Sequence, residues 1–92
     1  MQIEDILQQG EGLRVEFKTS FNMETIETLV AFANAKGGTV YIGVTDNGDV
    51  RGVKLGKESI QQWINEIKTK TEPFLIPEVE PIIYNEKLKT RG

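Results

Sequence analysis

The stretch from residue 31 to 49, AFANAKGGTVYIGVTDNGD, constrains the fold of this chain more than any other part of the sequence. It begins with the last turns of an amphipathic pattern whose three- and four-residue spacing is typical of a buried helix. Gly37-Gly38 ends that helix. The most apolar run of the chain follows at residues 40–44, which predicts a central β-strand.

The far end of this stretch carries a turn signal. Asn47-Gly48 is a pair that favours positive φ angles in a two-residue hairpin turn. We therefore expect residues 50–53 to return antiparallel to residues 40–45.

The rest of the chain alternates between helical and strand-like patterns. Leu13, Val15 and Phe17 alternate with charged residues, which predicts a strand with one buried face. The other predicted elements are a helix at 2–8 ended by Gly10, a helix capped by Asn22, a helix from Lys57 that Pro73 closes, and extended segments at 74–76 and 79–84. This order predicts an α/β fold with a small mixed sheet and helices packed against it.

Composition excludes several kinds of chemistry. The 92 residues fit a single domain spanning 1–92 and contain neither Cys nor His, so thiol nucleophiles, disulfides, imidazole bases and zinc sites of the usual kinds are excluded. No apolar run approaches the roughly 20 residues that a membrane-spanning helix needs. We expect a cytoplasmic protein with no membrane partner.

Charge is distributed unevenly, although the net charge is only -3. Residues 1–50 contain three basic and eight acidic side chains, whereas residues 51–92 contain eight basic and six acidic ones. A basic surface that binds nucleic acid must therefore come from the second half, from a second protomer or from further chain.

The sequence stops where another strand is expected to begin. Because an unpaired strand edge is normally covered in folded proteins, we expect the chain to be the N-terminal part of a longer protein, or to pair its open sheet edge with another copy as a homo-oligomer.

Four ordered motifs make the chain resemble a known family. They are EGLRVEFK at residues 11–18, AFAN at 31–34, GGTVYIGV at 37–44, and DNG at 46–48 followed by VRGV at 50–53. Together they resemble the Schlafen AlbA-type domain, whose pattern continues beyond the last residue here, so the domain is expected to be truncated at its C-terminus. The resemblance implies an α/β fold and a DNA-binding module at the head of a bacterial transcriptional regulator.

The same resemblance draws attention to three carboxylates. Glu11, Glu16 and Asp46 match the positions that form a metal-dependent RNA-cleaving site in the vertebrate Schlafen proteins, which implies a catalytic site holding Mg²⁺ or Mn²⁺. Residue types alone leave a structural alternative open: Glu11 is an acidic residue of a loop, Glu16 forms an ion pair with Lys18 or Lys36, and Asp46 starts a turn. No cofactor is required under that alternative.

Seven residues are candidates for contacts with DNA or RNA. They are Arg14, Lys18, Asn34, Lys36, Gly37, Gly38 and Arg51. Each also has an ordinary structural alternative: the glycines end a helix, Asn34 caps it, and the cations balance neighbouring acids.

Three functions remain after these arguments. The first is a nucleic-acid-binding module, and the second is a metal-dependent endoribonuclease. The third is a dimerisation domain that binds no nucleic acid.

Overall fold

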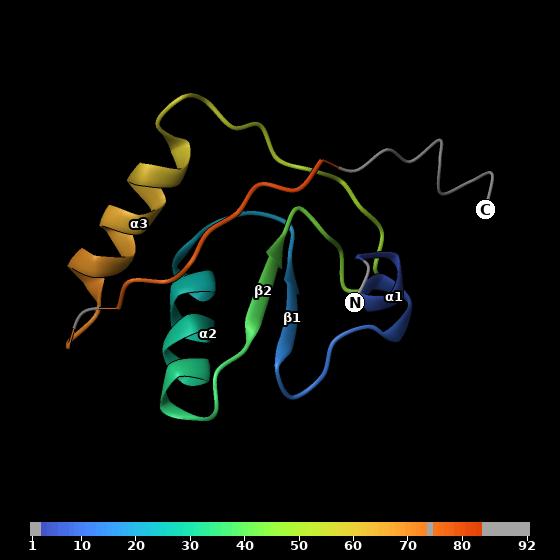
Figure 1. Ribbon diagram of the computed structural model, residues 1–92, viewed down its shortest axis with the longest axis horizontal. Coiled ribbons are helices and arrows are strands. Elements are labelled where there is room, and N and C mark those ends of the chain that lie inside the picture. The colour runs from blue at the N-terminus through green and yellow to red at the C-terminus, as the bar shows by residue number, and fades with distance from the viewer. Residues whose placement is uncertain (1–2, 74, 84–92) are drawn as a thin grey trace.

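The computed structural model describes residues 3–73 and 75–83. Five elements follow one another along the chain (Figure 1): α1 (Ile3–Gln9), β1 (Val15–Lys18), α2 (Met23–Asn34), β2 (Thr39–Ile42) and α3 (Ser59–Lys70). β1 and β2 form a two-stranded parallel sheet in which Val15 lies opposite Thr39 and Lys18 opposite Ile42. The expected α/β class is confirmed.

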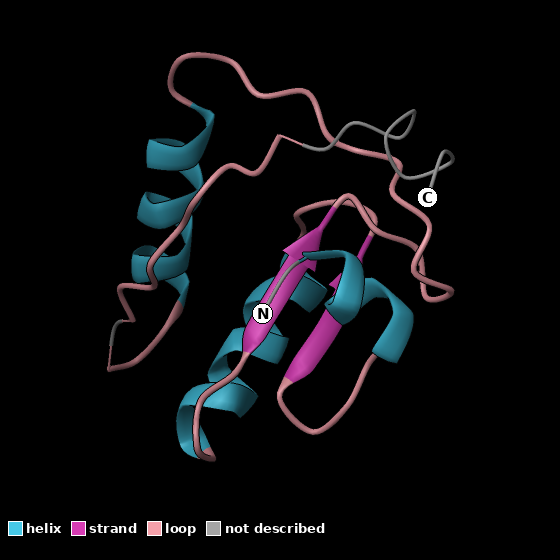
Figure 2. Cartoon of the chain, turned by 45° about the vertical axis from the view of Figure 1, so that its right-hand side comes forward, coloured by secondary structure: helices cyan, strands magenta, loops and turns pink. Residues whose placement is uncertain are grey.

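α2 connects the two parallel strands. Parallel strands cannot be joined by a tight turn, so the chain must cross from the end of one strand to the start of the next. Asn22 caps α2 as expected, because its Oδ1 accepts the Thr25 N–H at 3.3 Å while Thr25 Oγ1 accepts the Asn22 N–H at 3.2 Å. Thr25 and Ile26 are buried, and α2 packs against β2 on one face of the sheet (Figure 2).

Two glycines turn the chain from α2 into β2. Gly37 donates its N–H to the Phe32 carbonyl at 2.8 Å and has a φ of +89°, a conformation that side chains rarely adopt. A Cβ on Gly38 would lie 2.6 Å from the Phe32 ring. This pair therefore ends the helix as expected and sets the start of β2.

The core lies between β1, β2 and α1. Phe17 is 1% exposed and packs with Leu7 of α1 and with Val44. Tyr41 meets the Phe17 ring edge-on, with centroids 6.2 Å apart. Gly10 ends α1 with a positive φ and donates its N–H to the Ile6 carbonyl, as the sequence predicts.

Leu13 does not lie on the buried face of a strand, so that prediction is wrong. Its side chain is 98% exposed, and β1 begins only at Val15. Gly12 and Val15 exchange backbone hydrogen bonds, with the Gly12 N–H 2.9 Å from the Val15 carbonyl oxygen. This tight reversal places Leu13 at the tip of a turn.

The expected hairpin is also wrong in part. The Gly48 N–H donates to the Thr45 carbonyl and the Thr45 N–H donates to the Asp49 carbonyl, both at 2.9 Å. Between residues 45 and 49, only Gly48 has a positive φ. This is a three-residue turn, and beyond it Val44 and Val50 form a single antiparallel bridge.

The hairpin stops at a bulge. Arg51 and Gly52 both donate their N–H groups to the Gly43 carbonyl, at 2.7 and 2.9 Å, so two residues oppose one and the pairing breaks off. No strand forms at residues 50–53. Among the described residues β2 pairs only with β1, so it is an edge strand and not the central strand expected.

The later part of the chain contains one helix. α3 begins at Ser59, two residues after the expected start, and ends before Pro73. Residues 75–83 contain no strand, and positions 74 and 84 of the two expected extended segments lie outside the described residues. No helix in the described part of the chain has the length and apolar character needed to cross a membrane.

Two substitutions test the position of the core. We expect Phe17→Ala to lower the free energy of unfolding by about 3–5 kcal/mol, because it removes a fully buried ring. Leu13→Ala is the matched control and should change it by less than about 0.5 kcal/mol. Urea unfolding followed by circular dichroism measures both, and similar losses would show that Leu13 is buried after all.

Candidate functional site

Glu11 lies along the outer edge of β1. Gly10 turns the chain after α1, and the Glu11 Oε2 atom then accepts the Phe17 N–H at 3.0 Å. Even-numbered residues along β1 bond toward β2: the Arg14 carbonyl, just before the strand, accepts the Thr39 N–H, and the Lys18 carbonyl accepts the Gly43 N–H. Because backbone groups alternate in direction along a strand, the Phe17 N–H points away from β2. The Glu11 carboxylate thus takes the place of a neighbouring strand.

Glu16 shares a hydrogen bond with Glu11 through their side chains. The Phe17 N–H holds the pKa of Glu11 below its ordinary value of 4.5, and the hydrogen bond from Glu16 lowers it further. The pKa of Glu16 is raised, first by this hydrogen bond, then by desolvation and by the negative charge of Glu11. When the pair carries a single proton, Glu16 is therefore the residue that holds it.

Asp46 belongs to the same neighbourhood because its turn is docked on α1. A Cβ on Gly48 would lie 2.6 Å from the Leu7 carbonyl oxygen, which shows how closely the turn approaches the helix. The charge of Asp46 contributes to the raised pKa of Glu16. The structure brings Glu11 and Glu16 into contact and places Asp46 within electrostatic reach of them.

The three carboxylates do not form a metal site as they are arranged. In the described part of the chain, no group of three or more acidic side chains could hold a metal ion. One oxygen of Glu11 already accepts a backbone N–H, and the hydrogen bond between Glu11 and Glu16 would have to break before both carboxylates could bind a metal ion. This arrangement does not fit Mg²⁺ or Mn²⁺.

Lys18 is a cation whose charge acts on both glutamates of this group. Its Nζ atom lies 3.9 Å from Glu24 Oε1 at the start of α2, and its side chain is only 23% exposed. Its charge also lowers the pKa values of Glu11 and Glu16. Lys18 thus balances the acidic group, in agreement with the structural alternative for this residue.

The other candidate contact residues form two groups at opposite ends of the strands. The Arg14 carbonyl accepts the Thr39 N–H at 2.8 Å, which places Arg14 at the N-terminal end of the sheet beside the end of α2. The members of this first group, which we call the Gly-turn group, are Arg14, Asn34, Lys36, Gly37 and Gly38.

The cations of the Gly-turn group are available for binding. Arg14, Asn34 and Lys36 are exposed, and neither cation has an ion-pair partner within the described residues. The Gly37 N–H is used by Phe32, so of the two glycines only Gly38 has an amide without a hydrogen-bond partner in that part of the chain. Phosphate contacts in this group therefore depend on the two cations.

Arg51 lies at the opposite end of the strands. Its backbone N–H donates to Gly43, whose own N–H donates to the Lys18 carbonyl at 2.6 Å. A four-residue strand separates this end from the Gly-turn group, a length of roughly 13 Å at about 3.3 Å per residue. That length corresponds to about four base-pair steps along a duplex.

Sequence reasoning missed an aromatic pair. The rings of Phe21 and Trp63 stack with centroids 4.9 Å apart and planes 10° from parallel. Trp63 is on the predicted apolar stripe of α3, but Phe21 lies in the loop before α2, where no periodic pattern marks it. Only the docking of α3 brings the two rings together.

One comparison with known proteins identifies a family. The family model described as Schlafen, AlbA_2 matches residues 11–90. No curated protein and no solved structure matches the chain. The matched range contains all four motifs that carried the resemblance in the sequence.

The opposite pKa shifts of Glu11 and Glu16 can be observed directly. Carbon-detected NMR titration should give a pKa below 4.5 for Glu11 and above 4.5 for Glu16. The ionised Glu11 stabilises the folded state at pH values above its unfolded pKa, and this stabilisation is lost as the pH falls through its folded-state pKa. The protonated Glu16 stabilises the folded state at pH values below its unfolded pKa, and this stabilisation is lost as the pH rises through its folded-state pKa. In Glu11→Gln the pKa of Glu16 should return toward 4.5, and an unchanged value would contradict the pairing.

The docking of the Asp46 turn predicts a difference between two glycines. Gly48→Ala and Gly52→Ala both place a side chain at a positive φ, which costs about 1–2 kcal/mol. Only the Cβ at position 48 meets backbone, at 2.6 Å from the Leu7 oxygen, whereas position 52 has open space. Gly48→Ala should therefore be the more destabilising in urea unfolding, and equal losses would show that α1 does not hold this turn.

Proposed function

This chain belongs to the Schlafen AlbA_2 family, and we propose that it is the nucleic-acid-binding module of a bacterial transcriptional regulator that acts in the cytoplasm. Membership of this family indicates a function related to nucleic acids. Beyond this, we propose that the ligand is DNA, that the protein has a regulatory role, and that it forms an oligomer through its open sheet edge.

The free cations of the Gly-turn group support this proposal most directly. Arg14 and Lys36 are exposed at the same end of the sheet and have no ion-pair partner in the described part of the chain. Such side chains release condensed counterions when they meet phosphates, which drives binding to nucleic acid. Arg51 adds a third exposed cation at the other end of the strands.

Three cations suggest weak binding by one copy. A contact by each with duplex DNA gives a salt slope of about -2.7, so affinity should fall about 40-fold between about 50 and 200 mM salt. Pairing two copies doubles the number of contacts, which is why oligomerisation belongs to the proposal.

RNA cleavage by Glu11, Glu16 and Asp46 is the second candidate. The contact between Glu11 and Glu16, with Asp46 nearby, favours it. The lack of a metal-holding group in the described residues and the use of Glu11 as a backbone hydrogen-bond acceptor count against it. Binding is therefore the function that we propose.

A gel-shift assay with the whole chain tests the proposal. The probes are a fluorescent DNA duplex of two helical turns and an RNA stem-loop of equal length. Arg14→Ala and Lys36→Ala should each weaken binding and reduce the salt slope by about 1. Lys70→Ala is the matched control, because it removes the same charge from α3, where Lys70 pairs with Glu66 at 3.9 Å.

The outcomes separate the three candidate functions. A salt-sensitive shift that the control retains supports the binding module. No shift with either probe would leave the dimerisation domain, and a shift equally weakened by Lys70→Ala would refute the role of the Gly-turn group. Cleavage of the stem-loop with Mn²⁺ that Glu16→Gln abolishes would establish the nuclease in its place.

A further inference from the structure

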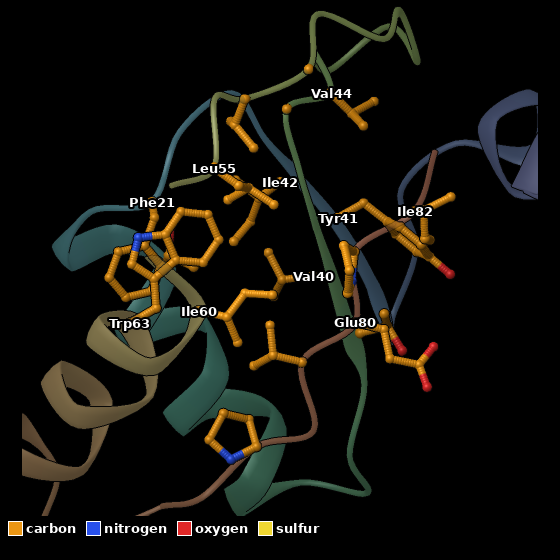
Figure 3. A pocket seen from close by; sticks show the side chains of 18 of the residues that line it. Phe21, Val40, Tyr41, Ile42, Val44, Leu55, Ile60, Trp63, Glu80 and Ile82 are labelled. Atoms are coloured by element: carbon orange, nitrogen blue, oxygen red, sulfur yellow. The ribbon is translucent and has the colours of Figure 1, made fainter. Parts of the chain in front are cut away.

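A large groove runs beside β2. Its volume is about 930 Å³, and β2, α3 and residues 77–82 all contribute to its walls (Figure 3). The side chains of Val40, Ile42, Ile60 and Trp63 make much of its lining apolar. The Phe21–Trp63 stack lies on the α3 side of this groove.

The backbone of β2 faces this groove with unpaired groups. Residues 39 and 43 donate to β1, so the N–H and C=O groups of Val40 and Ile42 point to the opposite edge. Within the described residues no backbone hydrogen bond reaches them. The groove thus combines apolar walls with the donors and acceptors that an added strand requires.

The two edges of the sheet differ in whether their outward backbone groups have hydrogen-bond partners. The outer edge of β1 is closed by the chain itself, because Gly12 pairs with Val15 and the Glu11 carboxylate accepts the Phe17 N–H. The outer edge of β2 has no backbone hydrogen-bond partner among the described residues, and its sequence, TVYI, contains neither a charge nor a proline that would discourage pairing.

Large apolar side chains on the walls of this groove remain exposed to solvent, as is typical of a surface that binds a partner. Ile82 and Leu55, which both line the groove, are 55% and 41% exposed.

We propose that the groove receives β2 of a second copy of this chain, paired antiparallel about a two-fold axis that passes beside Tyr41. This inference rests on the proposed function, which includes an oligomer, and it specifies which surface forms the interface of that oligomer. In this register Val40 lies opposite Ile42 of the second copy, and the outward N–H and C=O groups of both residues form four hydrogen bonds across the axis. The two sheets join into one of four strands.

The chemistry of the groove favours this occupant over others. A two-fold contact must be self-complementary, and β2 meets that condition because its paired side chains are both aliphatic and none is charged. Glu78 and Glu80 on one wall would repel a nucleic acid backbone. Arg14 and Lys36 do not line the groove, so we expect nucleic acid at their end of the sheet. A strand from another protein, or from this chain outside the described residues, is the remaining competitor.

A single cysteine tests the register, because the natural sequence contains none. In Tyr41→Cys the two sulfurs face each other across the axis, so air oxidation should give a disulfide-linked dimer on non-reducing gels. Thr39→Cys is the matched control: it lies opposite Gly43, about 13 Å from its own copy along the strand. We expect at least tenfold faster cross-linking at position 41, and equal rates would overturn the register.

A second measurement covers the case in which Tyr41→Cys does not fold. Val40→Pro removes an N–H that faces the groove and leaves the bonds to β1 intact. Sedimentation across a hundredfold range of concentration should show a dimer of the natural chain that is lost in Val40→Pro, with α-helical circular dichroism retained. A natural chain that stays monomeric, or a folded variant that still dimerises, would refute this interface.

These results can be separated from those on nucleic-acid binding. The paired strands contain no charged side chain, so dimerisation should not weaken as salt rises, whereas binding to nucleic acid should weaken with it. A monomer that still shifts DNA in a salt-dependent way would refute the interface alone. A dimer that shifts no nucleic acid would refute the proposed function alone.

Discussion

The parallel pairing of β1 and β2 is the constraint on which the rest of the structure depends. Parallel neighbours require a crossover, so α2 has to lie over the sheet, and the Asn22–Thr25 cap and the Gly37-Gly38 turn fix where that helix begins and ends. The same pairing places the N-terminal ends of both strands together. Arg14 is thereby brought against Thr39, just after the Gly37-Gly38 turn, although the two residues are 25 positions apart in the sequence.

The acidic group and the open edge follow from how the two sides of this small sheet are completed. On the β1 side the chain folds back: the Gly12 carbonyl accepts the Val15 N–H, and the Glu11 carboxylate accepts the Phe17 N–H that a neighbouring strand would have taken. Glu11 is therefore partly structural, and its hydrogen bond with Glu16 is a consequence of that position. On the β2 side a bulge at Arg51 and Gly52 stops the hairpin and leaves the backbone of Val40 and Ile42 without a partner.

Local sequence patterns predicted most of the elements because their causes are local. The apolar spacing and caps that define α1, α2 and α3 lie within each helix, and the alternation in β1 and the apolar run of β2 lie within each strand. The errors occurred where particular backbone hydrogen bonds, which the spacing of apolar residues does not encode, decide the outcome. Leu13 fits a strand pattern, yet the Gly12–Val15 reversal exposes it, and the bulge that ends the hairpin depends on one carbonyl accepting two N–H groups.

The sequence by itself determined the α/β class, the helix ends and the set of candidate site residues, because these depend on periodicity, on turn chemistry and on the motifs of residues 11–53. Only the tertiary structure decided which of those residues meet. It put Glu16 against Glu11, tied Lys18 to Glu24, and left Arg14 and Lys36 without ion-pair partners among the described residues. Distances between side chains far apart in sequence are set by how the strands pair and where α1 and α3 dock, and no local pattern encodes that.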